Sequence, residues 1–317
     1  MKFNPYSLAA ILLFPFLPVS PAAVAQDGPS LPFLLEQPDV RTQGLGGVTM
    51  PSEESTMQLY TDFSARSTLT DQRLNTAYAI SIYPGNASGR SLLHAFSTSL
   101  LLDRHAIGAG FRYWDATNVQ ARNQAGDLYT LKPYDWSIDL AYAFALTPNW
   151  AFHVGGSYFQ SYIGRTAEGA FFSAGVRYHD EAALRDQVLN YSVALHCRNL
   201  GPDVHYGSEG EKVHLPGVIQ LEGSLGTVFN EKHSLGLGLQ GGLFVNAPGA
   251  KGNFGVGLEY GYNHLLALRT GYEWGLKGNR YSVGGGVYWG GLGLDLAYTM
   301  GDDSDFNTFS IGLSHRF

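Results

Sequence analysis

A two-residue alternation runs through most of this chain from Asn75 to Phe317 and constrains its fold more than any other feature. Within residues 134–146, the apolar positions of one parity are Trp136, Ile138, Leu140, Tyr142, Phe144 and Leu146. The other parity carries aspartate, serine and alanine. Successive side chains of a β-strand point to opposite faces, so one face suits lipid and the other suits a polar lumen. The pattern predicts an all-β fold, a transmembrane β-barrel.

Fourteen segments carry this alternation, and an even number is what a bacterial single-chain antiparallel barrel needs to close. The predicted strands are Asn75–Tyr83, Leu92–Leu101, Ala106–Trp114, Tyr134–Leu146, Trp150–Gly164, Gly169–Tyr178, Val188–Asn199, Val218–Phe229, Lys232–Asn246, Gly252–Tyr262, Leu265–Leu276, Tyr281–Tyr288, Gly291–Met300 and Thr308–Phe317. They predict a 14-stranded antiparallel barrel over residues 75–317.

The connections between these strands alternate in length, as the periplasmic and extracellular connections of outer-membrane barrels do. The short turns, expected on the periplasmic side, are 103–105, 147–149, 230–231, 263–264 and 289–290. The longer connections, expected outside the cell, include 115–133, 200–217, 247–251 and 301–307. His179–Gln187 breaks this alternation, and we expect it to be a long periplasmic connection with room for a short helix.

Charged side chains of the predicted strands fall on the parity opposite to the apolar residues. Those expected in the lumen are Glu222, Glu259, Arg269, Glu273, Asp295 and Arg316. On the lipid face, a basic residue at the bilayer midplane would cost about 2–4 kcal/mol. Glycine accounts for 40 of the 317 residues, and many of these glycines lie inside predicted strands, where barrels bend and backbones approach closely.

The N-terminus has the pattern of a cleavable export signal. Lys2 precedes an apolar core at Leu8–Val19, and Ala23-Val24-Ala25 supplies a small-residue cleavage site. The core is too short for a spanning helix, so residues 1–25 predict export and a barrel in the cell outer membrane. Residues 26–74 lack the alternation. Because side chains alone fill the lumen of a fourteen-stranded barrel poorly, we expect this segment to fold inside as a hatch.

Composition and motifs exclude several classes of ligand. The formal net charge is −7, which disfavours nucleic acid, since phosphate binding is driven by lysine and arginine. The segment Gly236–Gly241 matches a dinucleotide fingerprint in letters, but it lies inside a strand with no helix following. Asp302, Asp303 and Asp305 lack the turn glycine and closing glutamate of a calcium-binding EF-hand loop. We therefore predict no cofactor and no metal site.

No catalytic set stands out among the polar side chains. Nucleophilic catalysis needs a nucleophile oriented by a base and a third group. His233 and Ser234 are adjacent and so point to opposite faces of their strand. His196 is lumenal by parity, with Ser192 four residues away and no acid on that face. The protein is therefore predicted not to be an enzyme.

Aromatic and charged residues occur together in the long connections. The residues predicted there to bind a partner are Trp114, Tyr129, Tyr134, Asp203 and Tyr206. Exposed aromatics among charges favour protein docking, and the same residues suit an ordinary aromatic girdle and loop surface equally well. A porin or a channel for hydrophobic molecules has less support, because inward phenylalanine is scarce, with Phe159 as one candidate.

The segment expected to form the hatch carries a group of short motifs. Residues 32–41 read PFLLEQPDVR and residues 44–48 read GLGGV, which resembles the start of the PorV/PorQ family of type IX secretion. Similar pieces follow in the family's order at 133–137 (PYDWS), 199–201 (NLG), 215–216 (LP), 259–260 (EY), 268–272 (LRTGY) and 295–298 (DLAY). The hatch motif of this resemblance consists of Pro38, Asp39, Arg41, Gly44, Gly46 and Gly47. Residues 60–65 (YTDFSA) depart from it, lacking the family's Asn-Pro-Ala element.

The resemblance implies a FadL-like barrel with an N-terminal hatch, and an adaptor function without bond chemistry. It implies partners: a SprA-type translocon barrel, the C-terminal signal domain of secreted cargo, and a PorU-like sortase that attaches cargo to surface lipopolysaccharide. Its leucine–proline loop adds Pro216 to the expected partner-binding residues. Two alternatives stay open at this stage, a PorQ-like structural subunit of the attachment complex and a FadL-like channel for hydrophobic small molecules.

Overall fold

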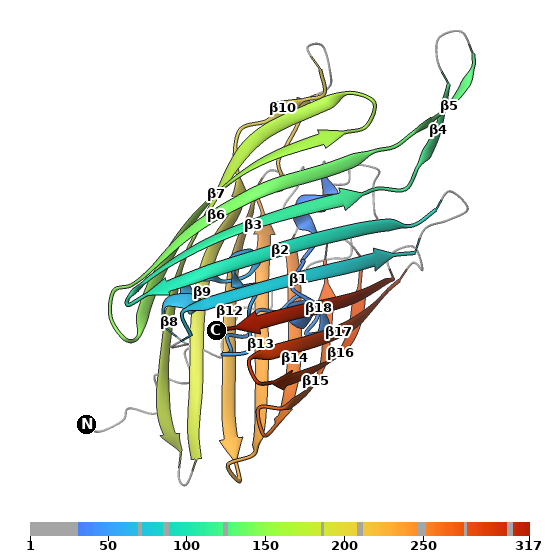
Figure 1. Ribbon diagram of the computed structural model, residues 1–317. Helices are drawn as coiled ribbons and strands as arrows, with labels where there is room; N and C mark the ends of the chain where they lie inside the picture. The colour runs from blue at the N-terminus through green and yellow to red at the C-terminus, as the bar shows by residue number, and fades with distance from the viewer. Residues whose placement is uncertain are drawn as a thin grey trace.

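The computed structural model describes residues 31–68, 72–84, 89–122, 126–184, 187–207, 212–245, 252–275, 278–302 and 307–317. Their main element is a closed barrel of antiparallel strands (Figure 1). In chain order the wall strands are β1 (Leu74–Tyr83), β2 (Ser91–Leu102), β3 (His105–Asp115), β6 (Tyr134–Ala145), β7 (Trp150–Tyr162), β8 (Thr166–Leu184), β9 (Gln187–Leu200), β12 (Val218–Phe229), β13 (His233–Phe244), β14 (Gly252–Tyr262), β15 (Leu266–Trp274), β16 (Arg280–Trp289), β17 (Leu292–Gly301) and β18 (Thr308–Arg316). The predicted 14-stranded all-β barrel is confirmed.

Each wall strand pairs with its neighbours along the chain, and the last strand closes on the first. Asn75 of β1 faces Arg316 of β18 in this antiparallel seam. Two small hairpins lie in the long connections: β4 (Val119–Arg122) pairs with β5 (Leu128–Leu131), and β10 (Val204–His205) pairs with β11 (Lys212–Val213). The β4–β5 hairpin projects beyond the barrel wall (Figure 1).

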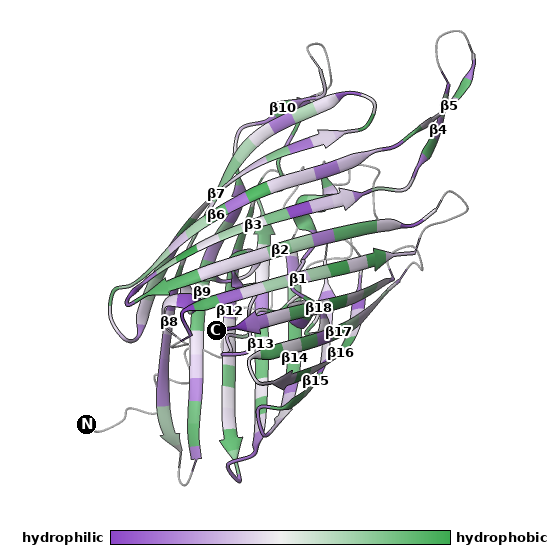
Figure 2. Cartoon of the chain, in the orientation of Figure 1, coloured by the Kyte–Doolittle hydropathy of each residue, from purple (hydrophilic) through white to green (hydrophobic). Residues whose placement is uncertain are grey.

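Apolar side chains of the wall face outward and charged side chains face inward. Leu235 and Leu294 are 48% and 39% exposed, whereas Arg269 and Asp295 are 4% and 9% exposed. Hydrophobic and hydrophilic positions accordingly alternate along the wall strands (Figure 2). The lumenal position predicted for these charges is confirmed, and its cause is the two-residue period of the strand.

The long periplasmic connection predicted over His179–Gln187 is wrong. β8 continues to Leu184, β9 begins at Gln187, and Asp180 pairs with Tyr191 in the ladder between them. At the periplasmic end of a barrel both faces of a hairpin are wet, so charged residues that interrupt the apolar alternation do not end the backbone ladder. With this hairpin, every connection at the end predicted to be periplasmic is short.

Residues 31–68 form a hatch inside the barrel, drawn in blue in Figure 1. Its elements are η1 (Pro32–Leu35), α2 (Val40–Gly44), η2 (Gln58–Tyr60) and η3 (Phe63–Ser67). Phe33, Leu45 and Phe63 are at most 1% exposed, so the apolar side chains of this segment are packed. Residues 1–30, with the predicted signal peptide, lie outside the described residues. No helix in the described part of the chain is long and apolar enough to cross a membrane.

Candidate functional site

The short helix α2 and its cap determine how the hatch meets the wall. Asp39 caps the helix and accepts hydrogen bonds from Thr42 N at 3.2 Å and Thr42 Oγ1 at 2.6 Å. Burial raises the pKa of the Asp39 carboxyl above its ordinary range, although the Thr42 hydrogen bond opposes the shift. Because the cap fixes the first turn of the helix, it also fixes the direction in which Arg41 leaves it.

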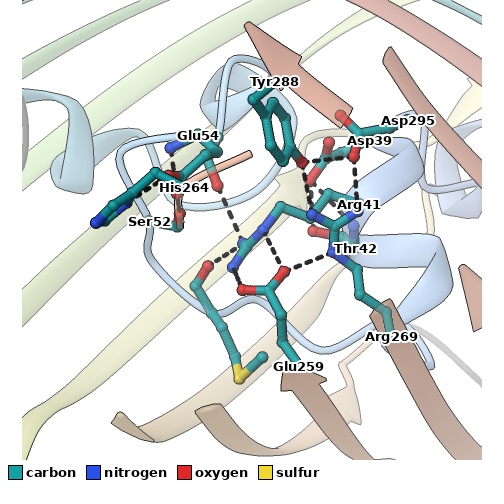
Figure 3. Close-up of polar contacts among 12 residues, drawn as sticks. Asp39, Arg41, Thr42, Ser52, Glu54, Glu259, His264, Arg269, Tyr288 and Asp295 are labelled. Carbon is teal, nitrogen blue, oxygen red and sulfur yellow. Dashed lines mark hydrogen bonds and ion pairs between the residues drawn. The ribbon is translucent and has the colours of Figure 1, made fainter. Parts of the chain in front are cut away.

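Arg41 reaches from the hatch to strand β14 (Figure 3). Its Nη2 lies 2.7 Å from Glu259 Oε1 and its Nε lies 3.0 Å from Glu259 Oε2. Its Nη1 donates to Ser55 Oγ at 3.1 Å and to the carbonyl of Met50. Burial opposes the charge of Arg41, but Glu259 outweighs it and raises the pKa of the guanidinium. This two-point contact is the geometry in which arginine and carboxylate bind most strongly.

Glu259 is shared with an arginine of the wall. Arg269 Nε lies 2.5 Å from Glu259 Oε2, and Arg269 Nη1 lies 2.6 Å from Asp295 Oδ1. Its Nη2 donates to Tyr288 Oη at 2.5 Å. We call Arg41, Glu259, Arg269 and Asp295 the arginine clamp. Its two positive and two negative charges cancel, so it holds the hatch without leaving a buried charge uncompensated.

Glycines of the wall make room for the hatch turn that follows α2. A Cβ atom on Gly271 would lie 2.1 Å from Leu45 C, and one on Gly257 would lie 2.6 Å from Leu45 O. Within the turn itself, Gly46 and Gly47 have φ angles of 68° and 79°, which glycine adopts without strain. Close approach of the hatch backbone therefore explains part of the strand glycine noted in the sequence.

A second contact between hatch and wall was not predicted from the sequence. Asp62 lies 3.1 Å from Arg177 Nη1 on β8, and its carboxylate is 3.6 Å from His153 and 4.0 Å from His196. His196 is also 3.3 Å from Glu222, so the expectation that no acid faces it is wrong. These acids come from the hatch and from a neighbouring strand, which parity along one strand does not reveal. We call these five residues the Asp62 cluster.

A cavity of about 160 Å³ lies against the hatch. Its lining includes the hatch residues Leu34, Pro38 and Leu59 and the charged wall residues Arg112, Asp139, Arg198, Glu273 and Arg280. Arg112 Nη2 lies 3.0 Å from Asp139 Oδ1, and Arg280 pairs with Glu273. Pockets for hydrophobic ligands are lined predominantly by apolar side chains, whereas ion pairs interrupt the lining of this one.

The sequence of this chain matches the model of a known family. The model of the type IX secretion system protein PorV matches residues 28–249. This chain belongs to the PorV family. It is therefore an outer-membrane protein associated with type IX secretion, and a search of the curated proteins finds no match. The family is one of protein secretion, and the absence of enzyme activity stays a prediction.

Solved structures share the fold of this PorV-family chain. The P. putida toluene transporter TodX matches with a TM-score of 0.56 at 12% identity, covering 92% of this chain and 99% of its own. The Ralstonia pickettii toluene transporter TbuX gives 0.56 at 12% identity, covering 90% and 100%. A Pseudomonas aeruginosa FadL homologue gives 0.50 at 12% identity, covering 89% and 99%. The fold of this PorV-family barrel is thus FadL-like.

Two of the predicted partner-binding residues lie in or directly beside the small hairpins of the long connections. Tyr129 of the β4–β5 hairpin is 47% exposed, and Leu128 beside it is 64% exposed. Asp203 is half-buried and pairs with Lys212 at 2.7 Å across the β10–β11 hairpin. In the acidic connection that follows β17, Asp303 and Asp305 lie outside the described residues.

The other predicted partner-binding residues pack against the hatch, the wall or neighbouring loop residues. One apolar cluster under the rim joins hatch, wall and loop residues: Leu31, Phe33, Leu34, Phe159, Ala167, Phe171, Val204, Val213 and Leu215. Trp114 and Tyr206 pack against this cluster, and Pro216 is buried. Tyr134 stacks between Tyr113 and Tyr162, with ring centroids 6.4 and 5.3 Å away. The contacts of these four residues are therefore made within the protein itself.

Proposed function

We propose that this protein is an adaptor of type IX secretion that binds the C-terminal signal domain of cargo at its extracellular rim. It then passes the cargo to the surface attachment complex. PorV-family membership supports this function. The observation that carries it is a lumen occupied by a hatch, held through the 2.7 Å contact between Arg41 and Glu259. Ion pairs line the cavity beside this hatch, so we infer that the barrel works through its outer surface and not through an apolar path in its lumen.

The β4–β5 hairpin is the part of the rim best suited to a protein partner. Among the described strands, β4 and β5 pair only with each other, so each offers an unpaired backbone edge to which a partner strand can add. Val119, Leu128 and Tyr129 are 47–64% exposed on this hairpin. Exposed apolar and aromatic side chains beside a free edge provide the apolar contact that a lasting interface needs.

The remaining partners of the adaptor follow from its place in the membrane. We propose that a SprA-type translocon supplies the cargo and that a PorU-like sortase receives it for attachment to lipopolysaccharide. Family membership supports an association with this machinery without separating the individual contacts. A PorQ-like structural role in the attachment complex uses the same rim and predicts stable binding to the sortase without binding to cargo.

A channel for hydrophobic small molecules is the second candidate function, favoured by the shared fold with the toluene transporters TodX and TbuX. Passage through the lumen would require the hatch to leave the arginine clamp. It would also bring an apolar molecule past the charged side chains of Arg112, Arg198 and Glu273, which line the cavity. Removing water from such charged groups costs free energy, and an apolar ligand forms no hydrogen bond or ion pair that would compensate for it.

The decisive experiment changes the hairpin and leaves the barrel intact. In cells that carry Leu128→Ser with Tyr129→Ser as their only copy, we expect at least tenfold less cargo cross-linked to the barrel and less cargo on the cell surface. The matched control is Ile163→Ser, since Ile163 is 53% exposed on another outer connection. Cross-linking equal to that of the control would contradict the adaptor. Loss of toluene uptake on deletion, with secretion intact, would support the channel.

A further inference from the structure

Three neighbouring wall strands bring two histidines together over a glycine. His153 of β7 and His196 of β9 both pair with Gly175 of β8 in the ladder. Two strand spacings, about 10 Å in total, separate the two histidine backbones, yet their ring centroids are only 5.4 Å apart. A Cβ atom on Gly175 would lie 2.4 Å from both His153 Cε1 and His196 Nδ1. Because Gly175 has no side chain, the two imidazole rings can approach each other across β8.

The hatch places Asp62 against these two rings. Asp62, His153 and His196 are 1%, 7% and 0% exposed, and one donor atom from each lies within 4.8 Å of the others. Asp62 Oδ2 is 4.0 Å from His196 Nε2, while Asp62 Oδ1 is occupied by hydrogen bonds from the backbone and hydroxyl of Ser64. The three residues come from two strands and the hatch, so only the assembled molecule contains the group.

The polar atoms that face one another in this group lack hydrogen-bond partners. Asp62 Oδ2, His153 Nδ1 and both ring nitrogens of His196 are buried without a hydrogen bond. Buried polar atoms in native proteins are nearly always paired, because an unpaired one loses its hydration without compensation. Each of the three residues therefore has at least one buried, unpaired atom that is able to coordinate an ion, and one donor atom from each lies within 4.8 Å of the others.

We propose that Asp62, His153 and His196 bind a divalent first-row transition-metal ion, with zinc as the representative, which ties the hatch to strands β7 and β9. Two imidazoles and a carboxylate are a common zinc-ligand set. At bond lengths of about 2.0–2.2 Å, donors around a tetrahedral zinc lie roughly 3.3–3.5 Å apart. Asp62 Oδ1 is 3.6 Å from His153 Nδ1 and Asp62 Oδ2 is 4.0 Å from His196 Nε2, so a small rotation of the carboxylate brings one oxygen toward both rings. Glu222 Oε2 lies 3.3 Å from His196 Nε2 and borders the three ligands without belonging to the group of donors within 4.8 Å of one another.

Arg177 competes with a metal ion for the carboxylate of Asp62. Its Nη1 lies 3.1 Å from Asp62 Oδ2, without hydrogen-bond geometry, while its Nη2 donates to Ser192 Oγ at 3.0 Å. In a metal site Arg177 would stay beside the carboxylate as an outer partner, a role that commonly orients metal-binding carboxylates. If Arg177 alone satisfies Asp62, no metal will bind, and the two arrangements can be separated by experiment.

The test uses the full-length exported barrel in detergent, stripped with EDTA, exposed to zinc and desalted. We expect one zinc per chain by elemental analysis, and a visible absorption band of tetrahedral cobalt when Co²⁺ replaces zinc. His153→Gln and His196→Gln should each weaken zinc binding at least tenfold. His94→Gln is the matched control, because His94 pairs with Tyr78 on the outer face.

A further variant keeps all three ligands and disturbs only their approach. Gly175→Ala should also weaken zinc binding, since its methyl group would meet both rings, and heat-modifiable migration on gels shows whether each variant still forms the barrel. Substoichiometric zinc in the wild type, or equal binding in His196→Gln and His94→Gln, would overturn the site and leave Arg177 as the partner of Asp62 Oδ2. This test does not involve secretion, so its outcome is independent of the adaptor function.

Discussion

Two of the contacts between hatch and wall, the arginine clamp and the Asp62 cluster, differ in how completely their polar groups are paired. In the arginine clamp, the three ion-pair distances are 2.5–2.7 Å. In the Asp62 cluster, the distances from Asp62 to its partners are 3.1–4.0 Å, and several buried nitrogens lack hydrogen bonds. A complete network resists change, whereas an incomplete one responds to pH and ligands. We therefore expect the clamp to set the stability of the closed barrel and the cluster to regulate it.

The largest effect is expected from the clamp. Glu259→Gln keeps the shape of the side chain but leaves Arg41 and Arg269 short of a negative charge, which should lower the free energy of unfolding by about 3–5 kcal/mol. Denaturant unfolding in detergent measures the change, and trypsin should cleave more readily at Arg41. Glu231→Gln in an exposed turn is the control. A change no larger than that of the control would show that Glu259 contributes no more to stability than an exposed carboxylate does.

A smaller loss is expected where the hatch turn meets the wall beside the clamp. Gly271→Ala places a methyl group 2.1 Å from the Leu45 backbone, and overpacking of this kind typically costs about 1–3 kcal/mol. Gly156→Ala is the matched control, because a Cβ atom there would meet nothing within 4 Å. Thermal unfolding in detergent compares the two variants. Equal thermal midpoints would show that the hatch backbone shifts to accept the methyl group without a loss of stability.

The Asp62 cluster predicts a pH dependence that the clamp does not share. Burial opposes ionisation of Asp62, but Arg177, followed by His196 and His153, outweighs it and holds the pKa of the carboxyl below its ordinary value. Because the folded-state pKa is depressed, the stabilisation is present above the ordinary value of about 3.9 and is lost as the pH falls below it. Each unit of depression contributes about 1.4 kcal/mol.

Proteolysis of the hatch across pH 3–7, with an acid-active protease at the low end, measures this dependence. The wild type should lose protection below about pH 4, whereas Asp62→Asn should be less protected at neutral pH and change less on acidification. Parallel curves for the two proteins would show that the low-pH change arises elsewhere in the molecule.

The smallest effect is expected from removing one serine hydroxyl in each contact, which shows where the remaining hydrogen bonds compensate for the loss. Ser64→Ala removes the hydroxyl that donates to Asp62 Oδ1 and should cost about 1 kcal/mol, the net value of an ordinary hydrogen bond, because the Ser64 backbone N–H still donates to the same oxygen. Ser55→Ala should cost less, because Arg41 keeps its bonds to Glu259 and to the Met50 carbonyl. Denaturant midpoints give the order. The reverse order would mean that the clamp is the less redundant contact.

The amino-acid sequence was sufficient for the barrel wall. The parity of Leu235 and Asp295 determines which face is wet, and the fourteen predicted strands match the observed wall strands within a few residues, except at the β8–β9 hairpin. That exception has a physical cause, since membrane alternation ends where the bilayer ends while the backbone ladder continues to Leu184. The family resemblance added the hatch motif, in which Arg41 proves to be the residue that crosses to the wall.

The contacts across the lumen were decided by the tertiary structure alone. Arg41 and Glu259 are 218 residues apart, and the Asp62 cluster draws on the hatch and strands β7, β8, β9 and β12. Alternation is a local property, with a period of two residues, and so it can be seen in the sequence. Which inward side chains meet depends on barrel closure and strand stagger, and on the path of a hatch that has no repeat. These are properties of the whole assembled molecule.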